Sequence, residues 1–505
     1  MKKRWLAILL CLVLALSACA NQAALTKPVC TSHTDADNNA LCDSCTINLW
    51  VSVDVYGIND LHGKIADADT HPGVDEMSTY FRNAQATQKN VILLSAGDMW
   101  QGSTESNMTK GALPTQWMNE LDFAAMTLGN HEFDWGEEPI EDNEKIAQFP
   151  FLAINIYDRE TNQQVSYCQS SVIIECDGVQ VGIIGAMGDC YSSIAGDKVQ
   201  DIYFITDDEL TQLVKEESAK LRAEGVDFVI YVLHDGFEDS KGASVTQVSD
   251  RQLASYYDAS LSDGFVDLVF EGHTHQRYLL QDEQGVYHLQ NGGDNKGISH
   301  AKLQINMVTG DSRVIANLVS SGTYAKLDDD PVVQDLLKEF ESQISPALRE
   351  VGYNAKYRNS KELCQLVADA YLRAGTEKWG DEYDIVLGGG FMSIRDPGEL
   401  PKGEVSYAML QGMFPFDNEL VLCSIKGSDL QKRFIETDNS RYYVSYSSYG
   451  NSVRNNIDPN KTYYVIVDSY SSPYAPNRLT EVARYGAGVY ARDLLADYIE
   501  AGGLE

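Results

Sequence analysis

The sequence predicts an α/β protein of at least two domains, and three features point to this. Its 505 residues exceed what one hydrophobic core accommodates. A hydrophobic content of 44% and a charged content of 22% are those of an ordinary globular chain. From Ile47 onward, short apolar and β-branched runs alternate with stretches of helical character, which is the pattern of buried strands in a layered α/β fold.

The N-terminus has the features of an export signal. Basic residues at positions 2–4 precede an apolar run at 5–16, which is too short for a permanent membrane span. The following Leu-Ser-Ala-Cys resembles a bacterial lipobox, which implies cleavage before Cys19 and lipidation of its thiol. A plain secretory signal with a chance cysteine is the alternative. We therefore expect a signal peptide at 1–18 and a lipid-anchored protein on the outer face of the cytoplasmic membrane, or on the periplasmic side of a membrane in a two-membraned cell.

The formal net charge of -35 restricts the partners of the protein. It argues against nucleic acid polymers and anionic membrane surfaces as main partners, because both would be repelled. A free mononucleotide is compatible with this charge where metal ions or arginines outweigh the repulsion locally.

A small module rich in Cys, His and Asp follows the anchor at residues 30–45. Four of its residues have the C-x2-H and C-x2-C spacing of a tetrahedral zinc site. Alternating Asp and Asn residues resemble an oxygen-ligand calcium loop, although Thr46 stands where such a loop needs an acidic residue. An acidic spacer with one disulfide is the third alternative. The candidate zinc ligands are Cys30, His33, Cys42 and Cys45.

Export permits disulfides, but spacing alone does not give their pairing. Cys168 and Cys176 are the nearest pair in the main body of the chain, and we expect them to be bonded.

Several of the apolar runs end in side chains that bind metal ions. In layered α/β folds the loops beyond the strand ends converge, so these side chains are expected to share one site. Each cluster alone would suit a turn or a buried histidine, but together they favour a metal centre. The seven candidate ligands are Asp60, His62, Asp98, Asn130, His234, His273 and His275.

This ligand set indicates the chemistry. Mixed Asp, Asn and His donors suit Zn, Mn or Co ions and do not suit Ca. Two such ions held ~3.5–4 Å apart clamp the attacking and leaving oxygens of a phosphoryl transfer. A bridging carboxylate would screen their repulsion, and a water shared by both ions would lose a proton near neutral pH and become the nucleophile.

The motifs DLHG, GDMWQG, GNHEFD, LHDG and EGHTH resemble, in order and spacing, those of calcineurin-like metallophosphoesterases. They most resemble the secreted bacterial 5'-nucleotidase and UDP-sugar hydrolase branch. The resemblance implies a four-layer α/β/β/α sandwich. It also implies that Asp60, His62 and His275 hold one metal ion and that Asn130, His234 and His273 hold the other, with Asp98 as the bridge. His275 stands where many secreted nucleotidases have Gln.

The stretch LGNHEFDWG contributes more than a ligand. The resemblance implies that His131 steadies the transition state or protonates the leaving oxygen. Asp134 would orient His131 and raise its pKa, as a carboxylate partner does. Glu132 is expected to serve the structure of the loop.

The motifs GGGFMSIR and PFDN resemble the C-terminal substrate domain of 5'-nucleotidases. This implies that Arg395 grips phosphate or carboxylate, that Phe416 stacks on a base and that Asn418 frames the base pocket. Tyr470 is the expected second stacking ring, with Tyr474 as its rival. The alternative for the two rings Phe416 and Tyr470 is a purely structural role in the core.

The sequence departs from this family pattern in three places. Leu387 stands where Asn is usual, Met392 and Ser393 are inserted before Ile394-Arg395, and the Asp expected to contact the ribose is missing.

These features divide the chain into a signal peptide at 1–18, an anchored linker at 19–46, a catalytic domain at 47–325, a connecting helix at 326–354 and a substrate domain at 355–505. We expect an exported dinuclear phosphoesterase that hydrolyses nucleoside 5'-monophosphates between the two domains. One alternative is the same chemistry on UDP-sugars, 2',3'-cyclic nucleotides or a non-nucleotide phosphate ester. Another is a surface nucleotide-binding lipoprotein with little turnover.

Overall fold

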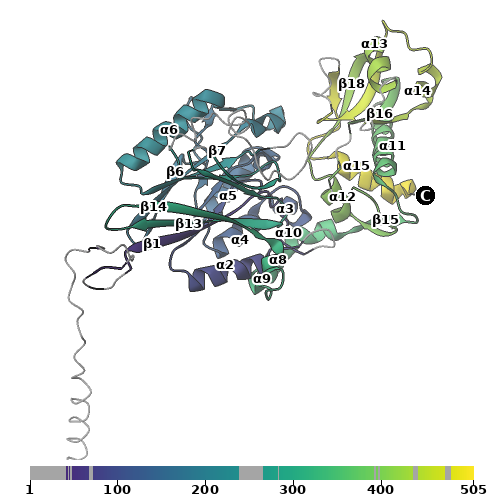
Figure 1. Cartoon of the computed structure of the whole chain (residues 1–505). Coiled ribbons are helices and arrows are strands. Elements are labelled where there is room, and N and C mark those ends of the chain that lie inside the picture. The colour runs from purple at the N-terminus through teal and green to yellow at the C-terminus, as the bar shows by residue number, and fades with distance from the viewer. Residues whose placement is uncertain are drawn as a thin grey trace, which may run out of the picture.

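The computed structural model describes most of the chain after residue 47 (Figure 1). The signal peptide, Cys19, Cys30, His33, Met392, Ser393 and Tyr474 lie outside the described residues, so the predictions that fall on them stay predictions. None of the helices in the described part has the length and apolar character that a membrane span requires. The described residues are 34, 41–43, 45, 48–67, 72–237, 265–282, 284–391, 394–395, 398–435, 442–471 and 479–504.

The first sheet of the N-terminal lobe has six strands in the order β14-β13-β1-β2-β3-β4. Strands β1 to β4 run parallel, and β13 and β14 add an antiparallel edge. The strands are β1 (Trp50–Ile58), β2 (Val91–Ser95), β3 (Ala125–Thr127), β4 (Phe151–Leu152), β13 (Gly297–Asn306) and β14 (Ser312–Ser320).

The second sheet also has six strands, in the order β11-β12-β10-β9-β7-β6. Its four central strands are parallel, and the two edge strands are antiparallel to them. The strands are β6 (Ser171–Cys176), β7 (Val179–Met187), β9 (Phe228–His234), β10 (Leu268–Glu271), β11 (Arg277–Gln281) and β12 (Tyr287–Asn291). A two-stranded ribbon of β5 (Ile156–Asp158) and β8 (Ile202–Phe204) lies apart from both sheets.

The two sheets stack face to face, and helices cover their outer faces, so the predicted four-layer sandwich is confirmed (Figure 1). Gly57 of β1 allows close approach of the sheets, because a Cβ there would lie 2.7 Å from the Phe270 ring of β10. The helices on the first sheet are α2 (Asp75–Thr87), α3 (Thr104–Met108), α4 (Ala112–Glu120) and α5 (Glu138–Ile146), and α6 (Asp207–Ala223) covers the second sheet.

Short helices connect the two lobes. Asp330 caps α9 by accepting a hydrogen bond from the amide of Val332, and Pro331 occupies the first turn, where its missing N–H costs nothing. The segment comprises α8 (Ser321–Tyr324), α9 (Pro331–Glu339), α10 (Glu341–Ile344) and the 3-10 turn η5 (Ser345–Leu348).

The C-terminal lobe is a second α/β unit around a five-stranded sheet in the order β19-β16-β20-β18-β21. One core lies between this sheet and the long helices α11 and α15, and a second core lies on the other face. The strands are β16 (Ile385–Phe391), β18 (Leu420–Lys426), β19 (Tyr442–Tyr446), β20 (Thr462–Asp468) and β21 (Thr480–Arg484), with a ribbon of β15 (Glu350–Asn354) and β17 (Gly403–Ser406). The helices are α11 (Ser360–Trp379), α12 (Tyr407–Met413), α13 (Gly427–Leu430), α14 (Ser448–Val453) and α15 (Ala491–Tyr498), with π-helical turns η6 (Gln431–Ile435) and η7 (Ile499–Gly503).

The expected bond between Cys168 and Cys176 is wrong, because both thiols are free. Cys168 lies in the core under the helices of the first sheet, and Cys176 lies in the core between the sheets. The extended strand β6 separates them, and at ~3.3 Å per residue its length far exceeds the reach of a disulfide.

Gly57→Ala is expected to destabilise the N-terminal lobe by about 1–3 kcal/mol, because the added methyl group overlaps the Phe270 ring. Thermal or denaturant unfolding of the metal-loaded protein measures this change. Gly196→Ala is the matched control, since a Cβ at Gly196 meets nothing within 4 Å. Equal stability of the two variants would contradict the close sheet packing.

Candidate active site

The seven predicted metal ligands come together at the carboxyl ends of parallel strands from both sheets. Asp60 and His62 follow β1, Asp98 follows β2, and Asn130 begins the 3-10 turn η1 (Asn130–Phe133) after β3. His234 ends β9, while His273 and His275 follow β10. The stacked sheets therefore deliver seven donors from five loops to one place.

One group of donors contains Asp60, His62 and His275, whose ligand atoms lie within 4.8 Å of one another. The Nε2 atoms of His62 and His275 are 3.0 Å apart, and Nε2 of His275 is 3.4 Å from Oδ1 of Asp60. Two imidazoles and one carboxylate at these distances fit a single transition-metal ion.

A second group is formed around the side-chain oxygen of Asn130. This Oδ1 lies 3.2 Å from Nε2 of His234 and 3.0 Å from Nδ1 of His273. Oδ2 of Asp98 is 3.2 Å from Nε2 of His234, and Asp98 also belongs to a cluster with His62. Asp98 therefore lies between the two groups, which is the place a bridging carboxylate needs.

The backbone at this centre is held in a sparsely populated conformation. Five of the seven candidate ligands have positive φ angles between 50° and 67°, a region that non-glycine residues rarely adopt. Such strain persists only where the surrounding structure enforces it, and it concentrates at functional sites. The five residues are Asp60, His62, Asp98, His273 and His275.

Backbone carbonyls orient two of the imidazoles. Nδ1 of His234 donates to the carbonyl of Ala96 at 2.6 Å, and Nδ1 of His62 donates to the carbonyl of Gln101 at 2.9 Å. These hydrogen bonds leave both Nε2 atoms free to face the centre with a lone pair, as metal-binding histidines require. The donor set and its second layer therefore fit divalent metal ions.

The two carboxylates of the centre are buried but remain ionised. Burial opposes their charge, yet His275 and His234 beside Asp60, and His234 and His131 beside Asp98, hold both pKa values below the ordinary value. Buried negative charge of this kind is stabilised by cations.

Glu132 joins the loop of Asp98 to the loop of Asn130. Its buried carboxylate accepts hydrogen bonds from four backbone amides, which lie at 2.9, 2.8, 3.3 and 2.7 Å and belong to Asp98, Met99, Trp100 and Gly129. Burial and the nearby Asp98 charge raise the pKa of Glu132 to about 7, and the amides act in the opposite direction. The expected structural role of Glu132 thus has a specific form: a clamp between two ligand loops.

His131 points from η1 toward the C-terminal lobe. Its Nδ1 lies 2.7 Å from Oδ2 of Asp134, and its backbone amide donates to Oδ1 of Asp98 at 2.8 Å. Although burial disfavours the charged ring, Asp134 and Asp98 raise the pKa of His131. Nε2 of His131 is 3.0 Å from the Arg395 guanidinium. The geometry therefore joins the predicted proton donor to the predicted phosphate-binding arginine.

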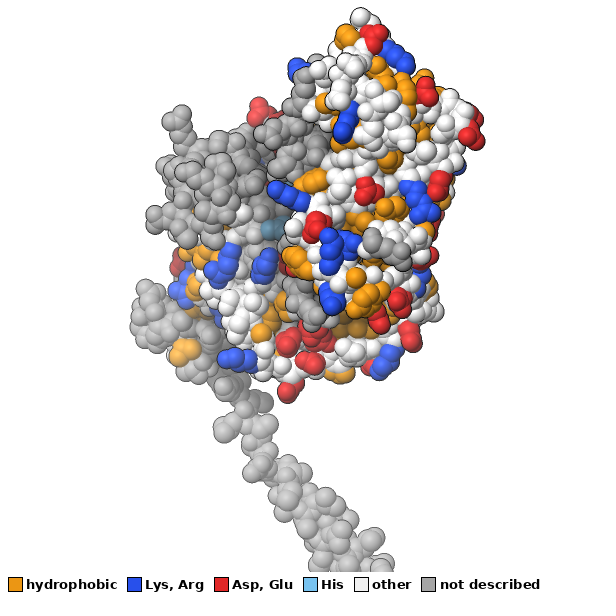
Figure 2. Space-filling view, turned by 90° about the vertical axis from the view of Figure 1, so that its right-hand side faces the viewer, with side chains coloured by type: hydrophobic (Ala, Val, Ile, Leu, Met, Phe, Trp, Pro, Cys, Tyr) orange, Lys and Arg blue, Asp and Glu red, His pale blue; other side chains and the backbone are white. Residues whose placement is uncertain are grey.

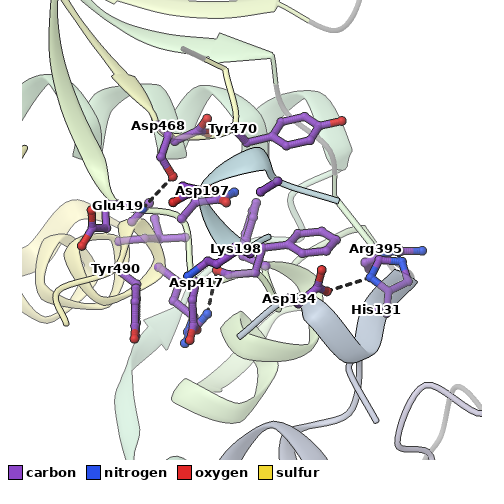
Figure 3. A pocket seen from close by; sticks show the side chains of 18 of the residues that line it. His131, Asp134, Asp197, Lys198, Arg395, Asp417, Glu419, Asp468, Tyr470 and Tyr490 are labelled. Carbon is purple, nitrogen blue, oxygen red and sulfur yellow. Dashed lines mark hydrogen bonds and ion pairs between the residues drawn. The ribbon is translucent and has the colours of Figure 1, made fainter. Parts of the chain in front are cut away.

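A cavity of about 390 Å³ lies between the two lobes. All four predicted substrate residues, Arg395, Phe416, Asn418 and Tyr470, line it together with Asn130, His131 and His273. The Phe416 ring is 5.9 Å from the His131 ring and 5.4 Å from the Arg395 guanidinium. Figure 3 shows His131, Asp134 and Arg395 grouped on one side of this cavity, and Figure 2 shows a histidine in the recess between the lobes.

The structure also reveals site residues that the sequence reasoning missed. Asp197 and Lys198 reach the cavity from the 3-10 turn η3 (Gly196–Lys198), and Arg484 reaches it from β21. Cys190, in the 3-10 turn η2 (Asp189–Ser193), offers a sulfur within 4.8 Å of donor atoms of His234 and His273. Its position just after a buried strand was the available signal, because the other ligands share that position.

Only half of the proposed structural zinc site lies in the described part of the chain. Cys42 and Cys45 are both buried and form a small cluster with Leu49.

Comparison with known proteins gives a separate family match for each of the two lobes. Residues 54–277 match the calcineurin-like phosphoesterase family, and residues 342–475 match the 5'-nucleotidase C-terminal domain. Protein UshA of Yersinia enterocolitica is 25% identical over 87% of this chain and 85% of its own length. The chain belongs to the 5'-nucleotidase family of calcineurin-like phosphoesterases. It is therefore a hydrolase of phosphate esters, and its family uses divalent metal ions.

Solved structures share this fold. The 5'-nucleotidase precursor of Thermus thermophilus aligns with a TM-score of 0.66 at 18% identity, over 89% of this chain and 96% of that one. A 5'-nucleotidase-like structure from Staphylococcus aureus aligns with a TM-score of 0.67 at 17% identity, over 90% of this chain and 98% of that one. Both comparisons confirm the two-lobed architecture.

Glu132→Gln is expected to lower metal affinity about 10- to 100-fold, because an amide cannot accept from four N–H groups with both of its ends. Metal titration of the stripped protein, read by calorimetry, measures the loss. Glu138→Gln is the control, since Glu138 is exposed at the start of α5. Unchanged affinity in Glu132→Gln would show that the clamp does not position the ligands.

Proposed function

We propose that the chain is an exported, lipid-anchored phosphoesterase with two divalent metal ions that releases phosphate from nucleoside 5'-monophosphates. One observation carries the proposal: the candidate metal ligands Asn130 and His273, together with His131 and aromatic side chains of the C-terminal lobe, line one cavity. The residues expected to act on the phosphate and those expected to bind a nucleobase therefore face the same cavity. Its partners would be a small phosphate ester and, through the lipid on Cys19, a membrane.

The side chains divide between two ions as the family resemblance implies. Asp60, His62 and His275 would hold one ion, and Asn130, His234 and His273 would hold the other, with Asp98 shared. The set of donors suits Zn, Mn or Co. When bound, such ions supply Lewis-acid activation of water and phosphate.

The residues of the chain would act on the substrate as follows. Arg395 would grip the phosphate, because a guanidinium fork pairs with phosphate oxygens. His131, held by Asp134 and carrying a raised pKa, would donate a proton to the leaving ribose oxygen. Arg395 and Nε2 of His131 lie 3.0 Å apart, so both groups can reach one bound phosphate ester.

Base recognition would use the C-terminal lobe. Phe416 and Tyr470 line the cavity and offer ring faces for stacking, and Asn418 offers an amide to the edge of the base. Lining the cavity supports these roles over a purely structural one for both rings.

The alternative substrates keep the metal chemistry and change the ester: UDP-sugars, 2',3'-cyclic nucleotides or a non-nucleotide phosphate. One observation favours these alternative substrates. Leu387, which stands where Asn is usual, is fully buried in the core of the C-terminal lobe and presents no polar group to the cavity. The intact seven-donor set speaks against the second alternative, a binding protein with little turnover.

Phosphate release from a substrate panel tests the proposal. The soluble protein, starting after Cys19 and loaded with Mn or Zn, is offered nucleoside monophosphates and p-nitrophenyl phosphate, with UDP-glucose and 2',3'-cyclic AMP assayed through a coupled phosphatase. AMP turnover is expected to fall about 10²- to 10⁴-fold in His131→Ala, because general acid catalysis is lost. Asp98→Ala is expected to lose metal as well as activity.

The results of the substrate panel distinguish the proposed function from its alternatives. Turnover of p-nitrophenyl phosphate without nucleotides would move the substrate elsewhere while keeping the metal chemistry. No turnover of any compound by the metal-loaded protein would contradict the proposed hydrolysis.

Phe416→Ala is expected to raise the KM for AMP about tenfold, since loss of stacking costs ~1–3 kcal/mol per base. The kinetics of p-nitrophenyl phosphate should change little, because that ester has no nucleobase. A steady-state comparison of both substrates measures this. Equal effects on the two substrates would argue that Phe416 only supports the fold.

A further inference from the structure

The two lobes contact each other beside the cavity through the loop region around α3 and the region around α12 (Figure 1). Oγ1 of Thr104 donates to the carbonyl of Ala408 at 3.1 Å, and Gln411 lies 3.8 Å from the sulfur of Met108. An ion pair also crosses the lobes: Nζ of Lys110, from the N-terminal lobe, lies 2.8 Å from Oδ2 of Asp417, from the C-terminal lobe.

Asp417 is held from two sides. Its carboxylate is 5% exposed and also pairs through Oδ1 with Arg492 of its own lobe, whose side chain is equally buried. Arg492 further donates to the carbonyls of Phe416 at 2.7 Å and Pro415 at 3.2 Å. The loop Pro415–Asp417 is therefore fixed to its own lobe by Arg492 and to the opposite lobe by Lys110.

The N-terminal lobe positions the backbone of Lys110. Its backbone has a φ of +49°, which a lysine rarely adopts, and its carbonyl accepts a hydrogen bond from Nδ2 of Asn143 at 2.7 Å. Its ammonium lies 4.7 Å from the centre of the Trp135 ring, next in sequence to Asp134. The ammonium therefore contacts both Asp417 and the ring next in sequence to Asp134.

These contacts form one chain from the reacting centre to the nucleobase surface. Phe416, whose ring lies 5.9 Å from that of His131, directly precedes the residue that Lys110 binds. Among the described residues, the side chain of Arg492 forms its hydrogen bonds and ion pairs within the C-terminal lobe. It therefore does not connect Phe416 to the N-terminal lobe. Lys110 is therefore one of the charged links between the lobes, beside Arg395 with His131 and Arg484 with Asp197, and it binds the residue next to the expected base-stacking ring.

We propose that Lys110 is a positioning residue for nucleotide recognition, which binds Asp417 across the lobes and thereby holds Phe416 at the distance from His131 that a nucleoside 5'-monophosphate requires. This rests on the proposed function, because it takes Phe416 as the ring that stacks on the base. A phosphate ester without a base does not use this distance.

Lys110→Met tests the proposal, since methionine keeps much of the apolar stem and removes only the charge. Arg492 still pairs with Asp417 in this variant, so the C-terminal lobe keeps its own ion pair. The KM for AMP is expected to rise about tenfold, because Phe416 is no longer held where it stacks on the base and stacking contributes ~1–3 kcal/mol. The kcat/KM for p-nitrophenyl phosphate should change less than about twofold. Lys89→Met is the control, because Lys89 is exposed and pairs with Asp177 within the N-terminal lobe.

Amide hydrogen exchange provides a measurement that needs no substrate. In the metal-loaded protein, exchange at the amide of Ala491, which donates to the carbonyl of Asn418 at 2.6 Å, is expected to be about tenfold faster in Lys110→Met than in Lys89→Met or the natural protein, because the loop loses its ion pair to the N-terminal lobe. This result would hold even if the enzyme proved inactive on nucleotides, so it separates failure of the link from failure of the proposed function.

Three results would overturn the positioning role. Unchanged exchange at the Ala491 amide would show that Lys110 does not hold the loop. Faster exchange with an unchanged KM for AMP would show that the loop does not position the base. An equal loss of activity on AMP and on p-nitrophenyl phosphate would show a general structural effect. Recovery of the AMP affinity in Lys110→Arg would instead support the positive charge as the cause.

Discussion

The active site depends on one buried carboxylate, that of Glu132, and on the four backbone amides that it binds. Backbone groups that lie away from water must find partners, and tight ligand loops have few carbonyls to offer them. Glu132 supplies these acceptors to two loops at once, and in doing so it fixes Asp98 beside Asn130. The strained backbones of the ligand residues then persist because rigid loops and stacked sheets hold them.

The two halves of the site are built by different means. The metal-binding half is made within one lobe, where parallel strands of two stacked sheets end at the same edge. The half that we propose binds the nucleotide belongs to the other lobe and meets the first through polar contacts of Arg395 with His131 and of Lys110 with Asp417. Such an arrangement joins a rigid reaction centre to a substrate surface whose placement depends on a small number of charged contacts.

The clustering of side chains at strand ends was predictable from the sequence. Asp60, Asp98 and Asn130 stand out because metal chemistry would demand their donor atoms at such positions, and the structure brings them together, while their binding of metal stays a prediction. Reasoning failed for Cys168 and Cys176, because closeness in sequence says nothing of the extended strand that separates them. It also missed Lys198, since a lone lysine in a loop has no signal before the loop is placed at a cavity.

The sequence by itself determined the chemistry of this protein, because the donor atoms, the His131–Asp134 spacing and the aromatic and arginine motifs are local properties of short segments. Only the tertiary structure decided how these segments meet. Three features involve residues that are far apart in the chain. They are the distance between Phe416 and His131, the pairing of Lys110 with Asp417 and the short distance between Cys190 and the candidate metal ligands. Such distances follow from the packing of sheets and lobes, which depends on every buried side chain together and on no single motif.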